Sequence, residues 1–393
     1  MGAHLLKQAE LKRLFLERFG ESQEDIRTFF APGRVNLIGD HTDYNGGLVF
    51  PCAIHYGTTL VIRPTTNNTY QLASTNFDLF AVLSKDQVNQ KYGDHWINYP
   101  LGVIQQFSED DLNGFECLYS GNVPNGAGLS SSASISVVTA FAINELFDCG
   151  LDNIEIIKIA QSAENDFVGV QCGVMDAYAV TMGRGDCAMM LNCDSLACEQ
   201  IPLDLGENAI VLINTNQRRE LSESKYNDRV VETRRALELL QSRYSVSQLV
   251  KITPQQLAES EALFTTADAT VYKRARHVVS EHHRVKAAVV ALRDQNLQGF
   301  GQLMFESHAS LRDDYDVSTD PLNALVDIAA EVDGVLGARL TGAGFGGCTV
   351  NLVHRDQIDE LSHRVAMAYP EKTGLTAELH QITPAQGVRE VIA

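Results

Sequence analysis

The sequence lacks the features that membrane-spanning and disulfide-stabilised proteins need. No stretch approaches the ~20 consecutive apolar residues of a transmembrane helix, and the first twenty residues are too charged for a secretory signal peptide. The eight cysteines are scattered without a CxxC pair, and no histidine cluster accompanies the closest two, Cys193 and Cys198. They indicate reduced core thiols rather than disulfides or a zinc site. We therefore expect a cytoplasmic protein without a membrane partner.

Basic residues are also scarce, since 31 Lys and Arg stand against 50 Asp and Glu, for a formal net charge of −19. Such an acidic surface repels phosphate backbones, which argues against nucleic acid as a partner. It also means that an anionic substrate must be held by a local positive field. Backbone N–H groups, a metal ion or a few well-placed Arg and Lys side chains can supply that field.

The 393-residue chain is long enough for two or three domains with proper cores. Strand-like and helical segments follow one another in a mixed order that does not alternate, which predicts an α+β fold. The second half is richer in helix, and we place the domain boundary near Leu205, with domains at 1–205 and 206–393. The clearest predicted helices span 131–147, 153–168, 222–242, 268–294, 296–312 and 320–332, and the clearest strands span 57–63, 69–83, 114–120, 187–192, 208–214 and 347–354.

The first of three glycine-rich segments, residues 31–47, combines acidic, imidazole and amide side chains at high density. Asp40, His41 and Asp43 lie within four positions, and Arg34 lies just upstream. This set suits a polyol, because each hydroxyl of a polyol both donates and accepts hydrogen bonds. A solvated turn closed by the last two glycines explains the local composition about equally well.

The second segment, residues 121–134, has the glycines and serines of a phosphate-binding loop. Glycines let the backbone curl so that several N–H groups point inward, and a helix that begins directly afterwards adds its unpaired N–H groups and its dipole. Ser131 and Ser132 could supply hydroxyls to phosphate or Mg²⁺. Ala127 stands where a P-loop needs lysine, so this is not a Walker motif. A serine cap on an alanine-rich helix is the simpler alternative, but it explains one serine and not the whole run.

The third segment, residues 341–348, formally matches GxGxxG through Gly342, Gly344 and Gly347. A dinucleotide-binding fingerprint must open a helix, whereas this segment leads into an apolar run that predicts a strand. We therefore reject the dinucleotide interpretation. A tight turn between two strands and a backbone that closely approaches a ligand remain equally good alternatives.

In this order and spacing, the three segments resemble the three motifs of the GHMP kinase superfamily. The run from Gly33 to Asn45 resembles the more specific signature of the galactokinase family, and the resemblance covers nearly the whole chain. It implies two α+β domains, the second ferredoxin-like, with the active site in the cleft between them. The other stretches that resemble this family are 51–54, 172–176, 224–227 and 307–314.

The same resemblance implies an enzyme that transfers the γ-phosphoryl group of ATP to the C1 hydroxyl of α-D-galactose, giving galactose 1-phosphate and ADP. This reaction is the first committed step of galactose catabolism in the Leloir pathway. Asp176 matches the family's catalytic aspartate, which accepts the hydroxyl proton, and Arg34 matches its partner arginine. Galactose and ATP are the expected partners of a protein that we expect to be monomeric.

Further positions match residues that bind the substrates in this family. Glu164 and Ser132 match ligands of Mg²⁺, and Trp96 matches an aromatic residue near the adenine. The positions that match sugar contacts, besides Arg34 and Asp176, are Asp40, His41, Asp43, Gly173 and Tyr226. The positions that match the phosphate loop are Gly126, Ala127, Gly128, Leu129, Ser130, Ser131 and Ser132.

Two positions depart from the family pattern. Galactokinases usually carry Glu where this chain has Asp40, so the shorter side chain implies a longer or water-bridged bond to a sugar hydroxyl, or a small shift. A Gln usually follows the catalytic aspartate, but here Ala177 does. That change deletes a possible hydrogen bond and leaves the proton acceptor in place.

Two other kinds of function are open on the sequence alone. A GHMP kinase could instead act on N-acetylgalactosamine, homoserine or mevalonate, although the polar segment 40–45 argues against the last two, which offer no polyol. A relative that binds sugar and ATP without turnover would be a sensor. The intact Arg34, Asp176 and Glu164 favour the enzyme.

Overall fold

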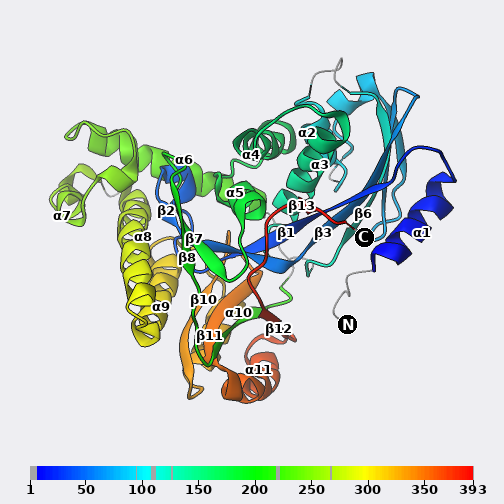
Figure 1. Cartoon of the computed structure of the whole chain (residues 1–393). Helices are drawn as coiled ribbons and strands as arrows, with labels where there is room; N and C mark the ends of the chain where they lie inside the picture. Colours follow the sequence, from blue (N-terminus) through cyan, green and yellow to red (C-terminus); the bar gives the residue numbers. More distant parts are fainter. Residues whose placement is uncertain are drawn as a thin grey trace.

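The computed structural model describes residues 7–93, 95–107, 112–124, 127–217, 222–265 and 268–392. Over these ranges the chain forms two α+β halves that pack against each other, so the predicted fold class is confirmed (Figure 1). No helix within these ranges has the length and apolarity to cross a membrane.

The first half is built on a sheet that has six strands in the described part of the chain, in the order β13-β1-β3-β6-β4-β5. Strands β4 and β6 pair in parallel, and the other neighbours are antiparallel. The strands are β1 (Arg27–Asn36), β3 (Pro51–Thr65), β4 (Thr69–Ser74), β5 (Ala81–Ser84), β6 (Gly114–Gly121) and β13 (Arg389–Glu390).

Both faces of this sheet are covered, so its central strands β1, β3 and β6 are buried along most of their length. On one face, Leu60 and Ile62 of β3 pack into a core shared with four helices. On the other face, Val61 packs with Leu11 and Phe15 of α1 (Gln8–Phe19). The helices of the first face are α2 (Asn98–Ile104), α3 (Ser131–Phe147), α4 (Asn153–Ser162) and α5 (Met175–Met182).

Strand β1 occupies the first part of the segment that could equally have been a solvated turn. Its register against β3 shifts between Pro32 and Gly33, and such a bulge bends a strand. Glycine is required at 33, because a Cβ there would lie 2.5 Å from the carbonyl oxygen of Leu129. The close approach holds the end of β1 against the loop before α3, directly beside Arg34.

The second half contains a sheet of order β10-β11-β9-β12 in the described residues, with helices on both faces. Along β9, Val211 and Ile213 face α10 and α11, whereas Ile210 and Leu212 face a core shared with α8 and α9. The elements are β9 (Asn208–Asn214), α6 (Ser222–Gln241), α7 (Pro254–Ala258), α8 (Ala269–Arg293), α9 (Leu297–Asp313), α10 (Asp320–Ala330), β10 (Val335–Leu340), β11 (Cys348–His354), α11 (Ile358–Thr373) and β12 (Glu378–Ile382).

The two halves share an apolar core, which fixes their relative position. Val35 and Leu37 from the first half belong to the same cluster as Leu212, Phe300 and Val350 from the second. The chain then returns, so that β13 at the C-terminal end pairs with β1 in the first sheet (Figure 1). A small antiparallel sheet also lies at this junction and comprises β2 (Leu48–Val49), β7 (Cys187–Asn192) and β8 (Cys198–Pro202).

Most predicted elements correspond to observed ones. The helix predicted at 131–147 is α3, and the strand predicted at 208–214 is β9. The strand-like pattern at 69–83 is divided between β4 and β5. The helix predicted at 153–168 begins as α4 and ends in a π-helical turn, Ala163–Val168, which carries Glu164.

Candidate active site

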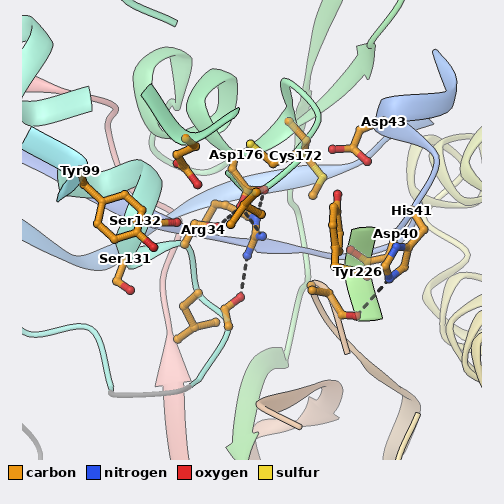
Figure 2. A pocket seen from close by; sticks show the side chains of 18 residues that line it. Arg34, Asp40, His41, Asp43, Tyr99, Ser131, Ser132, Cys172, Asp176 and Tyr226 are labelled. Carbon is orange, nitrogen blue, oxygen red and sulfur yellow. Dashed lines mark hydrogen bonds and ion pairs between the residues drawn. The ribbon is translucent and has the colours of Figure 1, made fainter. Parts of the chain in front are cut away.

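A cavity of about 260 Å³ gathers side chains from all three glycine-rich segments. Its walls come from the end of β1 and the turn that follows, the loop before α3, the start of α5 and the turn between β10 and β11. In Figure 2, Arg34 and Asp176 lie between two groups of side chains. The groups are Tyr99, Ser131 and Ser132 on one side, and Asp40, His41, Asp43 and Tyr226 on the other.

Arg34 and Asp176, which are 142 positions apart in the sequence, form a two-pronged ion pair. Arg34 donates from Nε to Oδ1 at 2.8 Å and from Nη2 to Oδ2 at 2.7 Å. Burial alone would lower the pKa of Arg34, but the charge and hydrogen bonds of Asp176 raise it above its ordinary value. The arginine side chain is 6% exposed and the aspartate 25%. The carboxylate is therefore the partner that is presented to the cavity.

The same pair also anchors the loop before α3. Arg34 donates from Nη1 to the carbonyl oxygen of Gly128 at 2.7 Å, and Ser130 donates from Oγ to Oδ2 of Asp176 at 2.5 Å. Ser130 has a left-handed backbone with φ 59°, a conformation that is uncommon outside glycine. The guanidinium, the carboxylate and the loop therefore form one fixed unit.

The backbone of this loop leads into the N-terminus of α3. The first helical bond of that turn is donated by the N–H of Ser134 to Ser130, so the amides before it are not used by the helix. Ala127 and Leu129 are buried in the core, and residues 128–132 line the cavity. Free amides at a helix N-terminus form an anion-binding site. The predicted phosphate-loop residue Gly126 lies outside the described residues.

A second cavity of about 170 Å³ adjoins the first and shares Tyr99, Ser131 and Ser132 with it. Trp96 and Phe77 also line this second cavity, and their rings are nearly parallel at 18°, with centroids 6.3 Å apart. The indole Nε1 of Trp96 is buried without a hydrogen-bond partner among the described residues. A flat heteroaromatic ring with an acceptor nitrogen suits such a cavity.

At the opposite end, Asp43 is buried and packs against the backbone of Gly173. A Cβ at 173 would lie 2.1 Å from Oδ2 of Asp43, so glycine is required there. Burial raises the pKa of Asp43 to about 7, and the negative charge of Asp176 acts in the same direction. Tyr226, at the start of α6, lines the same end of the cavity.

Asp40 also lines the cavity but is tied to the second half of the molecule. Its Oδ1 accepts from Nδ2 of Asn36 at 2.9 Å, and its Oδ2 is paired with Nη2 of Arg339. Arg339 is completely buried and also donates to the carbonyl oxygen of Asn36 at 3.0 Å. Asp40, whose side chain is shorter than the Glu usual in the family, is thus fixed at the wall of the cavity.

Glu164 and Ser132 line the same cavity and supply the oxygen donors that Mg²⁺ prefers. The described residues contain no group of three or more His, Cys, Asp or Glu that could hold a metal ion. One carboxylate and one hydroxyl nevertheless fit a magnesium ion that takes its remaining ligands from water and phosphate oxygens. No hydrogen bond among the described residues occupies the hydroxyl of Ser132.

Several lining residues were not predicted from the sequence. Tyr99 lies three positions after Trp96 at the start of α2, and that helical spacing was the available signal. Cys172 and Met175 flank predicted residues in the sequence. The third glycine-rich segment is the turn between β10 and β11, and its Gly342 and Ala343 also line the cavity.

Comparison with known proteins agrees with this architecture. Residues 98–184 match the family model described as GHMP kinases N terminal domain, and residues 288–371 match GHMP kinases C terminal. The mevalonate kinase of Methanococcus jannaschii shares the fold at 20% identity, with a TM-score of 0.63 over 93% of this chain and 100% of that one. Together with the three-part site, these matches define a GHMP kinase.

Within that superfamily, residues 13–64 match the Galactokinase galactose-binding signature. The galactokinases of Clostridium tetani and Bacillus subtilis are 44% and 42% identical, over 97% of this chain and 97% and 98% of their own. The chain belongs to the galactokinase family. The solved structure of Lactococcus lactis galactokinase complexed with galactose is 39% identical, with a TM-score of 0.94 over 98% of this chain and 99% of that one. The protein is therefore an enzyme, a kinase that uses ATP as a substrate.

Proposed function

We propose that this enzyme binds galactose and transfers the γ-phosphoryl group of ATP to its C1 hydroxyl, as the first committed step of galactose catabolism. The observation that carries the proposal is the Arg34–Asp176 ion pair, which lies between the two groups of cavity side chains in Figure 2. The galactose complex of the Lactococcus lactis relative supports the choice of sugar.

The sugar would occupy the end of the cavity lined by Asp40, Asp43 and Tyr226. Carboxylates accept from sugar hydroxyls, and a phenol can both donate and accept. Gly173 brings backbone close to the same place because it has no side chain. His41 completes this wall through its ring.

The nucleotide would occupy the other end. The adenine fits the cavity beside Trp96, and the triphosphate fits the free amides of residues 128–132 at the N-terminus of α3. Ser132 and Glu164 would hold Mg²⁺, which when bound neutralises negative charge on phosphate oxygens. This arrangement solves the problem of binding a polyanion in a protein of net charge −19.

Asp176 would accept the proton of the C1 hydroxyl as phosphoryl transfer proceeds. Arg34 pairs with that carboxylate and stabilises the charge that develops next to it. Phosphoryl transfer has a loose transition state that asks little of the nucleophile. Positioning and charge neutralisation by these two residues therefore matter more than complete removal of the proton beforehand.

We further propose that the active enzyme is a cytoplasmic monomer with domains at 1–205 and 206–393. The shared apolar core supports a single compact chain, in which the cavity lies where the two halves meet. The return of β13 to the first sheet adds a short C-terminal segment to the first of these domains.

An ADP-release assay with four sugars tests the proposed function. Galactose, N-acetylgalactosamine, glucose and talose would each be supplied with ATP and Mg²⁺, and the product of any reaction would be identified by phosphorus NMR. The proposal predicts turnover of galactose with phosphate on C1. Turnover of N-acetylgalactosamine at a higher kcat/KM than galactose would contradict it.

A further inference from the structure

His41 has an unusual backbone conformation at the wall of the sugar end. It follows β1 with φ 63° and is 4% exposed. A non-glycine residue in the left-handed region costs free energy and persists only where surrounding contacts determine the conformation. The contacts that determine it come from both halves of the molecule.

Both ring nitrogens of His41 are already engaged by protein groups. Nε2 lies 3.1 Å from the carbonyl oxygen of Ala343, in the turn between β10 and β11. Nδ1 lies 2.9 Å from the hydroxyl oxygen of Tyr44, and that hydroxyl lies 2.7 Å from the hydroxyl of Tyr315. In Figure 2, the labelled His41 ring points toward the carbonyl group to which it is joined by a dashed line.

The chemistry of these groups assigns a direction to each hydrogen bond. A carbonyl oxygen only accepts, so Nε2 of His41 must carry the proton and donate to Ala343. In a neutral imidazole Nδ1 is then an acceptor, so Tyr44 donates to it. The hydroxyl of Tyr44 has thereby used its one proton, so its oxygen accepts from Tyr315.

The imidazole is neutral, as this sequence of bonds requires. Burial lowers the pKa of His41 to about 4, although Asp40 acts in the opposite direction. The positive charges of Arg229 and Arg339 lower the pKa further. At neutral pH the ring therefore has one donor and one acceptor.

The ring is also enclosed by aromatic side chains. Its centroid lies 4.7 Å from that of Tyr315, which is completely buried just after α9, and 5.5 Å from that of Tyr226. Tyr226 lines the sugar end of the cavity. A change in the orientation of His41 would therefore move a wall that contacts substrate.

We propose that Tyr44 and Tyr315 are positioning residues that hold His41 in its Nε2-protonated form and thereby set the shape of the sugar end. The expected kinetic effects rest on the proposed function, whereas the tautomer of His41 follows from the hydrogen bonds alone. His41 then contributes its ring to the pocket wall, and neither nitrogen is available to a sugar hydroxyl. The carboxylates and Tyr226 are left as the hydrogen-bonding groups.

Removing single hydroxyl groups tests this proposal with little change in shape. Tyr44→Phe leaves Nδ1 of His41 buried without a donor, and we expect the KM for galactose to rise about tenfold. Tyr315→Phe acts one bond further away, with an expected rise of about threefold. The kcat and the KM for ATP should stay within about twofold, since the phosphate side is untouched.

The double variant distinguishes a connected chain from two independent contacts. If both hydroxyls act through His41, the double variant should have about the same KM for galactose as Tyr44→Phe alone. Independent effects of the two substitutions would instead multiply. Tyr369→Phe is the matched control, because its buried hydroxyl donates to the carbonyl oxygen of Thr215, outside the cavity, at 2.9 Å. It should change neither KM.

Nitrogen-15 NMR of histidine-labelled protein at pH 7 reads the tautomer directly. The His41 signal, assigned by its loss in His41→Gln, should show a protonated Nε2 and an unprotonated Nδ1, and Tyr44→Phe should shift the Nδ1 resonance. A protonated Nδ1 in the wild type would overturn the proposal, as would unchanged galactose KM values in both Tyr variants. A wild-type protein that fails to phosphorylate galactose would refute the proposed function, and the NMR result would still decide the tautomer.

Discussion

At the residue scale, Arg34 illustrates how burial and charge oppose each other in the site. Burial disfavours its charged guanidinium, yet the bonded carboxylate of Asp176 raises the pKa of Arg34 above its ordinary value. The arginine is therefore positive at every accessible pH, and its three donor nitrogens are directed to Asp176 and to the carbonyl oxygen of Gly128. This residue couples the proton acceptor to the phosphate loop.

We predict that Arg34→Ala lowers kcat by about 100-fold or more, because preorganised charge at the reacting atoms is lost. The KM for ATP should change by less than about threefold, since the amides of the loop remain. Steady-state kinetics with ATP and galactose varied in turn measure both quantities. A raised ATP KM with an unchanged kcat would show that Arg34 only binds nucleotide.

The raised pKa of Asp43 predicts a pH dependence of stability. The carboxyl titrates near 3.8 when unfolded and at about 7 when folded, so between these values the folded state holds a proton that the unfolded state has released. Stability from this group therefore falls as pH rises from about 4 to 7 and is level above that. Asp43→Asn removes this slope.

Urea unfolding of the wild type and Asp43→Asn at pH 5 and pH 7.5 measures the difference. One pKa unit corresponds to about 1.4 kcal/mol. From pH 5 to pH 7.5, the free energy of unfolding of the wild type should therefore fall by at least about 1 kcal/mol more than that of the variant. Comparing the two proteins cancels the contribution of His41, whose lowered pKa has the opposite sign. Equal slopes would show that Asp43 is ionised in the folded protein at pH 5.

At the element scale, the site depends on backbone segments that approach each other without intervening side chains. Gly33 lets β1 approach the loop before α3, and Gly173 lets the segment before α5 approach Asp43. Neither approach could be predicted from local sequence, because each glycine meets an atom far away in the chain. The family resemblance marked Gly173 as a sugar-contacting position, but it did not show that Asp43 packs against it.

We predict that Gly173→Ala raises the KM for galactose by at least about tenfold while leaving the melting temperature within a few degrees. The new methyl group would displace the Asp43 carboxylate, which lies 2.1 Å from the Cβ position, and misplaced groups near the chemistry are costly. Gly185→Ala is the matched control, because nothing lies within 4 Å of its Cβ position. Similar KM values in the two variants would contradict the assigned role.

Helices were easier to predict than the strand that carries Arg34. The pattern at 268–294 repeats every three to four residues and gave α8 almost to the residue. Strand β1 is buried on both faces, so it shows no alternation of polar and apolar residues, and it contains Pro32 and Gly33, which are disfavoured inside strands. The bulge that accommodates them depends on pairing with β3.

At the scale of the whole molecule, the cavity exists because the two halves are fixed to each other. Arg339 from β10 and Tyr315 after α9 reach the turn that follows β1. These contacts could not be predicted from the sequence, because the two residues in each pair are 299 and 271 positions apart. Residues within the three glycine-rich segments were predictable, and those that hold the segments together were not.

The C-terminal strand is predicted to stabilise the first half. A chain that ends after Gln386 loses three backbone hydrogen bonds to the first half. These are donated by Gly387 to Gly183, by Val388 to Val180 and by Val391 to Thr28. At about 1 kcal/mol per bond, the melting temperature should fall by roughly 5–10 °C. Ile392→Ala, at an 88% exposed position, is the control and should change nothing. An unaltered melting temperature in the truncated chain would contradict this role of β13.

The proposed mechanism requires that Asp176, paired with Arg34 between the two ends of the cavity, accepts the proton of the attacking hydroxyl. A rapid-quench single-turnover experiment on Asp176→Asn, with galactose and ATP binding measured by calorimetry, tests it most directly. We expect both ligands to bind within about threefold of the wild type, while phosphoryl transfer slows by about 1,000-fold. Transfer within tenfold of the wild-type rate in this folded, ligand-saturated variant would contradict the claim.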